Sequence, residues 1–449
     1  MRRGSDGAHN ADMADVRQIA ECVGEPEGTV AQWDSLGLLA EPAVERARLI
    51  GFAARRGVSA AEIAELLDRG QDVIGSFVEF VQAECGSRPF GALAELSELD
   101  PGLVRRLWIA AGLSDQRDVY DEDVELFGGL AAALRLGLPE DALLQLVRVF
   151  GDAMGRVAEA QIRLFHLQVH SRMRAEGLSG VRLLETARAV SDPLTELGDA
   201  ALAYFHRKAM QRALREDMIM HLTEDLAAEE TEVGQVSVAV LFADLAGFTP
   251  MTEAMGDRVA AAVVERFSDV VREATGEAGG RIIKQIGDEF MLAFGTAAAA
   301  VSCGLGLAER LAEEPNFPAL RMGAHVGSAL YREGDYLGTT VNIAARVAGH
   351  ATRGQFLVTE AMRDQLPGDG QDVKFEPVGG RRLKGIQGEV PLFDLRAGTA
   401  RPGRAVDPVC RMEVDPTRAA AELSWREDRV YFCSDDCLRQ FVATPGRFV

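Results

Sequence analysis

The sequence lacks a long apolar run, and no stretch approaches the roughly 20 residues that a helix needs to cross a bilayer. The opening segment, MRRGSDGAHN, also lacks the apolar part of a secretory signal. A concentrated basic patch is absent as well, and the formal net charge of −21 repels nucleic acid and anionic membranes. These absences argue against a membrane-spanning protein. They predict a cytoplasmic protein that binds neither nucleic acid nor membrane.

The length of 449 residues predicts about three domains. Apolar residues recur at three- and four-residue spacing in the first half, which predicts an all-α region over residues 1–228. Strands and helices alternate over residues 232–398. A linker at 399–404 then leads to a small cysteine-containing module at 405–449. The chain is therefore expected to be multidomain.

The middle region has the predicted order strand, helix, hairpin, helix, strand. This βαββαβ order is typical of the α+β ferredoxin-like fold, with both helices on one face of the sheet. The first strand ends in VAVLFADLAGF, and the hairpin is IIKQIGDEFML. Asp244 and Asp288 are thus lone carboxylates at the ends of apolar strands, and Gly287 predicts a tight turn at the hairpin tip. Buried charges of this kind require a cation, and paired carboxylates suit Mg²⁺-dependent phosphoryl chemistry.

A second group of polar residues surrounds GDYLGTTVNIAARVA. Helical spacing places Asn342 and Arg346 on one face, where an amide and a guanidinium can reach the same ligand. Asp335 lies in the preceding loop, and Lys284 is a lone cation in the first hairpin strand. Each has a structural alternative as a turn or cap residue, a surface ion pair or a strand-edge charge. Their joint occurrence favours a site.

These segments together resemble the class III nucleotidyl cyclases over about residues 235–397. FADLAGFT and KQIGDEF are similar to the two metal-binding segments of that family, and DYLGTTVNIAAR to its purine, ribose and transition-state segment. The resemblance implies an adenylyl cyclase that converts ATP to 3′,5′-cyclic AMP and pyrophosphate with two Mg²⁺ or Mn²⁺ ions per site. It implies metal ligation by Asp244, Leu245 and Asp288, and phosphate binding by the backbone at Phe248 and Thr249.

The resemblance also assigns the second group of residues. It implies purine recognition by Lys284 and Asp335, ribose orientation by Asn342 and transition-state stabilisation by Arg346. Aspartate as acceptor and lysine as donor complement adenine, and guanylyl-selective members carry a different pair. Lys384 is a further candidate for phosphate contact, although its segment departs from the family pattern.

The hairpin predicts a dimer. Lys284 and Asp288 lie four residues apart, yet one is expected at the base and the other at the metal end of an extended nucleotide. One copy of the hairpin cannot serve both ends, and the resemblance likewise implies a head-to-tail homodimer with two shared sites. His325, in the strand ALRMGAHVG, is expected to be a packed histidine.

The helical region has its own resemblances. Residues 14–70 have helix-turn-helix spacing, similar to that of MerR-type DNA-binding proteins. However, residues 18–45 contain no Lys or Arg and several acidic residues, which favours a protein-interaction or packing role. The whole region resembles the regulatory domain of bacterial adenylyl cyclases, some of which respond to pH. A helix at 199–228, carrying His206 and His221, is placed to transmit a signal to the first catalytic strand.

Six cysteines form two sets. Cys22, Cys85 and Cys303 lie in apolar helical patterns, which predicts buried structural thiols. The C-terminal set lies in DPVCRMEVDP and VYFCSDDCLRQF, which resemble the YHS domain, although Arg411 stands where that family usually has glycine. Spacing allows a Zn²⁺ or Cu⁺ site formed by Cys410, Cys433 and Cys437. The alternative is a packed module without metal.

Three functions remain open from the sequence. An adenylyl cyclase regulated by its flanking modules is favoured. A degenerate cyclase domain that senses nucleotide and acts through a transcription-regulator-like start is the second. A guanylyl cyclase is the third, and the Lys284–Asp335 pair disfavours it.

Overall fold

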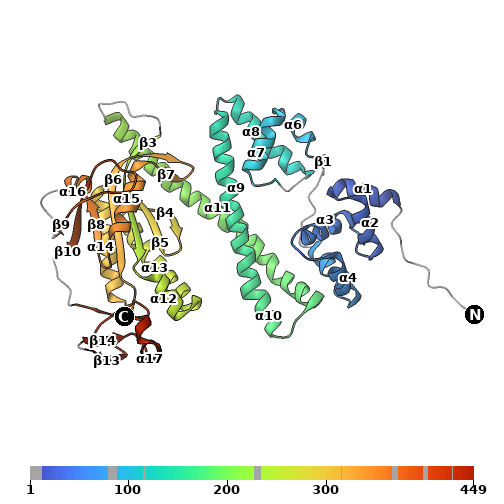
Figure 1. Ribbon diagram of the computed structural model, residues 1–449. Helices are drawn as coiled ribbons and strands as arrows, with labels where there is room; N and C mark the ends of the chain where they lie inside the picture. Colours follow the sequence, from blue (N-terminus) through green and yellow to red (C-terminus); the bar gives the residue numbers. More distant parts are fainter. Residues whose placement is uncertain are drawn as a thin grey trace, which may run out of the picture. The chain divides into compact units, whose positions relative to one another are not determined.

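The computed structural model describes residues 13–78, 88–114, 118–226, 234–314, 316–366, 373–397, 403–426 and 428–448. The chain divides into two compact units, Met1–Ala227 and Ala228–Val449, which are coloured from blue to green and from green to red in Figure 1. Cys85 and most of the expected linker at 399–404 lie outside the described residues. In the described ranges, no helix is both long and apolar enough to span a bilayer.

The first unit is helical, as expected, apart from a two-stranded ladder of β1 (Arg88–Pro89) and β2 (Asp118–Val119). Its α-helices are α1 (Met13–Val23), α2 (Glu27–Ser35), α3 (Ala43–Ala54), α4 (Ala60–Asp68), α5 (Val73–Val78), α6 (Ala92–Ser97), α7 (Pro101–Ala110), α8 (Asp121–Arg135), α9 (Glu140–Phe165), α10 (Ser171–Ala175) and α11 (Gly180–Leu226), and a π-helical segment at His166–His170 joins α9 to α10. Helix starts follow local chemistry. Ser59 and Glu62 form a capping box on α4, and Asp100 accepts a hydrogen bond from the Leu103 N–H at the start of α7.

The helix-turn-helix start has a core of its own around Val30, Trp33 and Ile50. Arg46 is 3% exposed, and its guanidinium forms two 2.8 Å hydrogen bonds with the Asp72 carboxylate. This basic residue is therefore engaged inside the unit. The expectation of a buried Cys22 is wrong, because this thiol lies on the exposed side of α1.

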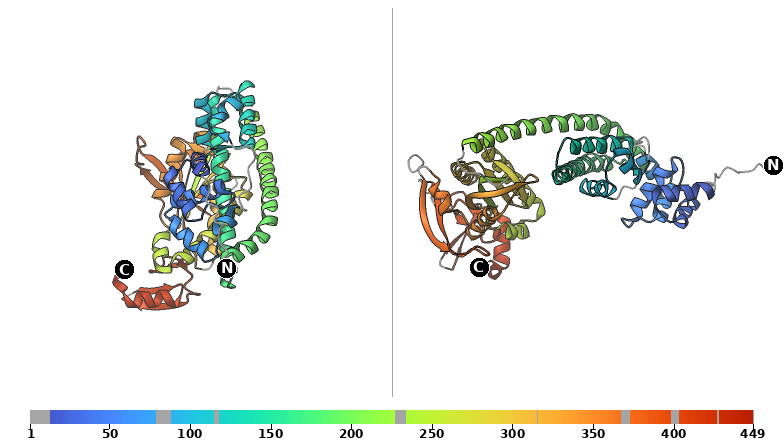
Figure 2. Two further views of the ribbon diagram at one scale, coloured as in Figure 1. Left: turned by 90° about the vertical axis from the view of Figure 1, so that its right-hand side faces the viewer. Right: turned by 90° about the horizontal axis from the view of Figure 1, so that it is seen from above.

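Helix α11 is longer than expected. It begins at Gly180 and continues past Pro193, and Figure 2 shows it as one unbroken ribbon in green. Proline removes one hydrogen bond to the carbonyl of Ala189, but Ala189 is exposed, so water can replace the missing donor. His206 contacts Phe150 of α9 at 6.5 Å between ring centroids, and His221 bonds the Asp217 carbonyl of its own helix.

The second unit contains an eight-stranded sheet in the order β4-β5-β3-β6-β8-β10-β9, with β7 paired to β6. Its strands are β3 (Gln235–Leu245), β4 (Arg281–Ile286), β5 (Glu289–Phe294), β6 (Leu320–Arg332), β7 (Asp335–Leu337), β8 (Phe356–Thr359), β9 (Val373–Arg381) and β10 (Val390–Ala397). Its helices are α12 (Phe248–Met255), α13 (Asp257–Glu277), α14 (Ala297–Glu313), α15 (Thr339–His350) and α16 (Glu360–Asp364). The central four strands follow the order expected of a ferredoxin-like core, and further strands extend the sheet.

The two faces of this sheet have different helices. Leu241 of β3 packs with Phe267 of α13 and Leu307 of α14, so these two helices cover one face, as expected. Helix α15 packs on the opposite face, where Ala344 and Ala348 join the Phe242 cluster (Figure 1). The expectation of helices on one face is therefore incomplete, since alternate residues along buried strands present apolar side chains to both faces.

The C-terminal module is small and shares its core with the part of the unit that contains the eight-stranded sheet. It consists of β11 (Ala405–Val406), β12 (Glu413–Val414), β13 (Ala421–Trp425), β14 (Asp428–Phe432), α17 (Asp435–Ala443) and a 3₁₀ turn at Pro445–Arg447. Phe432 and Phe441 belong to the same buried cluster as Leu245 and Met251. The Glu413 N–H also donates to the Phe317 carbonyl at 3.1 Å. This module is therefore packed against the domain that contains the eight-stranded sheet.

Candidate active site

Asp244 lies at the end of β3 and is 6% exposed. It faces Arg321 directly across the β3–β6 ladder, and the Arg321 guanidinium forms an ion pair with its carboxylate. Arg321 was not identified from the sequence. Arg321 is a lone cation in the apolar strand ALRMGAHVG, and the same pattern identified Lys284 as a candidate. The sequence could therefore have suggested Arg321, but only the strand register shows that its partner is Asp244.

Asp288 lies at the tip of the β4–β5 hairpin, as expected. Ile286 pairs with Glu289, and Gly287 has a φ of 63°, so Gly287 and Asp288 form a two-residue turn. Burial raises the pKa of Asp288 to about 7, and a hydrogen bond to Asp244 and the charge of that residue add to the effect. Burial and the charge of Asp244 also raise the pKa of Glu289. This cluster has excess negative charge and oxygen ligands, so it fits a divalent cation.

The segment after Asp244 leads into a helix start. Gly247, with a φ of 85°, is the N-cap of α12, and Phe248 and Thr249 follow in its first turn. Backbone N–H groups at such a helix start can bind phosphate oxygens. Phe248 also lines a shallow hollow of about 450 Å³ with Val264 and Gly287.

Lys284 and Asp335 are in direct contact, with Nζ and Oδ2 2.6 Å apart. A β-bulge between Ile282 and Lys284 shifts the register, so Lys284 pairs with Met291. Met291 belongs to the apolar cluster under α15, which also contains Tyr336, the neighbour of Asp335 in β7. The bulge therefore directs Lys284 towards Asp335, which sequence periodicity does not reveal.

Asn342 and Arg346 lie on α15, as expected. Asn342 is exposed, and Arg346 is half-buried with one Nη atom that is buried without a hydrogen-bond partner among the described residues. Gly385 lies beside Arg346, because a Cβ added to this glycine would be 3.3 Å from an Arg346 Nη atom. The exposed Lys384 directly precedes Gly385 and is therefore also close to this guanidinium. In the described part of the chain, no hydrogen bond or ion pair joins Asn342 or Arg346 to the aspartate pair.

His325 is a packed histidine in this structure. Its Nδ1 lies 2.8 Å from the Thr359 hydroxyl, and burial lowers its pKa to about 4. The imidazole is therefore neutral near pH 7 and contributes to packing within the sheet.

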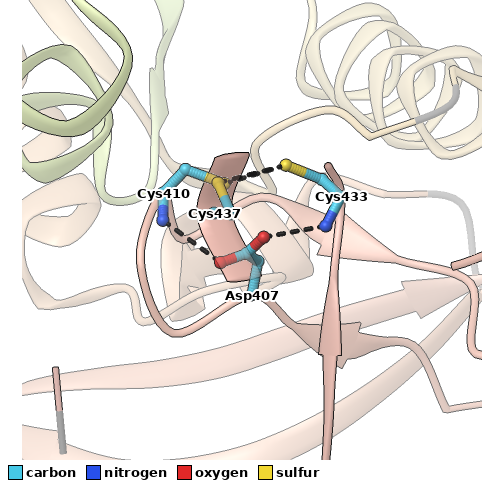
Figure 3. A group of neighbouring side chains, drawn as sticks. All are labelled: Asp407, Cys410, Cys433 and Cys437. Carbon is cyan, nitrogen blue, oxygen red and sulfur yellow. Dashed lines mark hydrogen bonds between the residues drawn. The ribbon is translucent and has the colours of Figure 1, made fainter. Parts of the chain in front are cut away.

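The C-terminal cysteines converge, and Figure 3 shows them with a fourth residue, Asp407. Cys410 and Cys433 Sγ atoms are 3.4 Å apart, and those of Cys433 and Cys437 are 3.6 Å apart. Hydrogen bonds with Cys410 and Cys433 lower the pKa of Cys437 to about 3. Hydrogen bonds with Cys433 and Cys437 raise the pKa of Cys410. The cluster thus favours a thiolate. Asp407 was missed, because nothing in DPVC shows that its side chain points inward.

Comparison with known proteins identifies the family. The family described as "Adenylate and Guanylate cyclase catalytic domain" matches residues 231–397. A pH-sensitive adenylate cyclase of Mycobacterium tuberculosis is 29% identical over 384 residues, which cover 82% of this chain and 93% of that protein. An adenylate cyclase of Streptomyces coelicolor is 30% identical, with 67% of this chain and 77% of that protein covered.

A solved structure is also similar. The adenylyl cyclase CyaB from P. aeruginosa is 21% identical, with a TM-score of 0.33 and coverage of 38% of this chain and 100% of that chain. On the strength of the sequence relatives, the chain belongs to the adenylate and guanylate cyclase family.

Proposed function

We propose that this protein is an adenylate cyclase that converts ATP to 3′,5′-cyclic AMP and pyrophosphate. The observation that carries the choice of substrate is the Lys284–Asp335 contact on the sheet face that also holds Asp244. An aspartate acceptor and a lysine donor complement the amino group and ring nitrogen of adenine. The Mycobacterium and Streptomyces relatives are both named as adenylate cyclases, which supports the same substrate.

The residues of the chain have separate tasks in this reaction. Asp244, Asp288 and the backbone of Leu245 would hold two Mg²⁺ or Mn²⁺ ions, with Arg321 balancing the charge of Asp244 when no metal is bound. When bound, the ions supply acidification of the ribose 3′-hydroxyl and charge neutralisation at the leaving phosphates. Backbone N–H groups at Phe248 and Thr249 bind phosphate oxygens.

The residues around α15 act on the other parts of the nucleotide. Asn342 orients the ribose, and Arg346 meets the charge that develops on the α-phosphate as the 3′-oxygen attacks. The buried Nη atom of Arg346 without a partner is a hydrogen-bond donor available for this task. Lys384, next to Gly385, is placed to contact the phosphates from the neighbouring turn.

The active site is proposed to form between two copies of the chain. Lys284 and Asp288 occupy one hairpin, and Asp335 binds Lys284, so the base-binding and metal-binding groups of one copy cannot serve opposite ends of one nucleotide. A two-fold dimer solves this, because each site takes its aspartates from one subunit and Lys284, Asp335, Asn342 and Arg346 from the other.

Purine selection gives a direct test. Asp335→Ala removes the acceptor and leaves Lys284 without its partner, so kcat/KM for ATP is expected to fall about 100-fold while that for GTP changes little. Cyclic nucleotide formation from both substrates measures the effect. Glu333→Gln, in the exposed turn two residues earlier, is the matched control and should leave both rates near wild type. An equal loss with ATP and GTP would show that Asp335 does not contact the base.

Regulation is proposed to come from residues 1–228. The M. tuberculosis relative that is named as pH-sensitive matches this chain over 82% of its length, which includes part of the helical unit. A chain beginning near Glu232 is therefore expected to differ at least about fivefold from the full chain in cyclase activity, with a different pH profile. His206→Gln and His221→Gln in the full chain test whether these histidines set that profile. Identical activity and pH dependence of the short and full chains would rule out regulation by the helical unit.

A further inference from the structure

The C-terminal thiols have a fourth sulfur neighbour that lies in the catalytic domain. Met255, the last residue of α12, places its Sδ 3.9 Å from the Cys437 Sγ. With the 3.4 and 3.6 Å separations among the thiols, this gives a chain of four sulfur atoms in contact. Ligands about 2.3 Å from one central ion lie about 3.8 Å apart at tetrahedral corners. The three separations along this chain of sulfur atoms are close to that value.

Asp407 has a different task, because its oxygens already accept backbone hydrogen bonds. Oδ1 accepts from the N–H groups of Val409 at 2.8 Å and Cys410 at 3.4 Å, and Oδ2 accepts from that of Cys433 at 2.8 Å. Asp407 is fully buried, so these bonds replace its hydration. The carboxylate thus positions the backbone of two thiol residues, and the ligand set that remains consists of sulfur.

An all-sulfur set selects a soft cation. Thiolates bind both Cu⁺ and Zn²⁺, and the thioether of Met255 favours Cu⁺, whereas a carboxylate in its place would favour the harder Zn²⁺. All three cysteines are buried, at 0–9% exposure, so the ion would be shielded from water. The charge of Arg353 interacts with Cys410. Arg353 donates to the Ala246 carbonyl at 3.2 Å, and its other Nη atom is buried without a partner among the described residues.

The module touches both ends of α12. At the start, a Cβ on the N-cap Gly247 would lie 3.0 Å from the Arg411 side chain. At the end, the Gln440 Nε2 donates to the Ala254 carbonyl at 3.4 Å, one residue before Met255. Because α12 begins with the phosphate-binding Phe248 and Thr249, an ion that fixes Met255 also fixes the helix that carries this segment.

We propose that Cys410, Cys433, Cys437 and Met255 form a Cu⁺ site, and that filling it orders α12 and lowers the KM for ATP. The kinetic part rests on the proposed cyclase function, whereas the metal site does not. An ordered helix start binds phosphate with a smaller entropic cost, so copper loading is expected to lower KM at least about fivefold. By reciprocity of binding free energies, an ATP analogue that lacks the 3′-hydroxyl should tighten Cu⁺ binding by the same factor by which copper tightens binding of that analogue.

The test uses the full chain, purified under reducing conditions and titrated with Cu⁺ against a competing chelator. One ion per chain is expected, with sulfur-only coordination by X-ray absorption spectroscopy. Met255→Leu keeps the volume of the side chain but removes the thioether, so Cu⁺ affinity should fall about tenfold and the KM shift should disappear. Met251→Leu, a buried methionine of the same helix outside the sulfur cluster, is the matched control and should behave as wild type.

Three results would overturn the proposal. Equal Cu⁺ affinity in the Met255→Leu and Met251→Leu variants would remove Met255 from the site. Preferential Zn²⁺ binding that is lost in a folded Asp407→Asn variant would make the carboxylate a ligand. Copper binding without any change in ATP-analogue affinity would remove the link to α12. If the chain forms no cyclic AMP but copper and the ATP analogue still tighten each other, the proposed function fails while the coupled site stands.

Discussion

Mixing the Asp244→Ala and Arg346→Ala variants is expected to restore about a quarter of wild-type activity, although each variant alone is nearly inactive. Loss of a metal ligand or of transition-state stabilisation should lower kcat by about 100- to 1,000-fold or more. Random pairing makes about half of the dimers mixed, and each mixed dimer has one intact site out of two. Co-expression of the two variants, followed by measurement of cyclic AMP formation by the unfractionated dimers, provides the result.

A second mixture is the control for this experiment. Asp244 and Asp288 belong to the same half of the proposed site, since the charge of Asp244 helps to raise the pKa of Asp288. Mixing Asp244→Ala with Asp288→Ala leaves every site in a mixed dimer with at least one defective metal ligand, so no recovery is expected. If neither mixture recovers activity, or if both do, the division of the site between subunits is wrong.

Gly323→Ala is expected to be the most damaging substitution away from the active site. A Cβ at Gly323 would lie 2.0 Å from the backbone nitrogen of Ala348, because α15 packs directly on β6 at this point. Helix α15 would have to move away from the sheet, at a cost of about 3 kcal/mol. The thermal midpoint of the catalytic unit should fall by roughly 5–10 °C. The kcat should fall at least about tenfold, since α15 carries Asn342 and Arg346.

Gly349→Ala provides a matched comparison on the same helix. A Cβ at Gly349 would meet nothing within 4 Å, so this variant should keep its activity and gain up to about 1 kcal/mol from helix propensity. Calorimetry and cyclase assays of both variants give the comparison. If the Gly323→Ala protein has wild-type stability and kcat, the close approach of α15 to β6 does not contribute to the free energy of unfolding or to catalysis.

Local sequence chemistry predicted much of the catalytic domain. The apolar run that ends in Asp244 is β3, and Gly287 sets the turn that places Asp288 at the hairpin tip. Helical spacing located Asn342 and Arg346 on α15. These features depend on neighbours within a few residues, and such patterns are visible in one sequence.

The features that were missed depend on contacts between distant segments. Arg321 meets Asp244 only through the register of β3 and β6, and Met255 meets Cys437 only after the C-terminal module has packed on α12. Asp407 was missed for the same reason, because the three backbone groups that it binds come from two separate loops. Periodicity also could not place α15 on the opposite face of the sheet, since β3 is apolar on both sides.

The bulge in β4 has a consequence for how base preference can diverge among relatives. Ile282 pairs with Leu292, so if Ile283 were drawn into a regular ladder, Lys284 would stand opposite Phe290 and point into the α13–α14 core. A change that closes the bulge without shortening the strand would therefore bury the lysine and remove it from Asp335 in a single event. Substitutions that alter the register of β4, and not only replacements at the two positions proposed to contact the base, are thus a route by which natural selection can change or abolish nucleotide choice in this lineage.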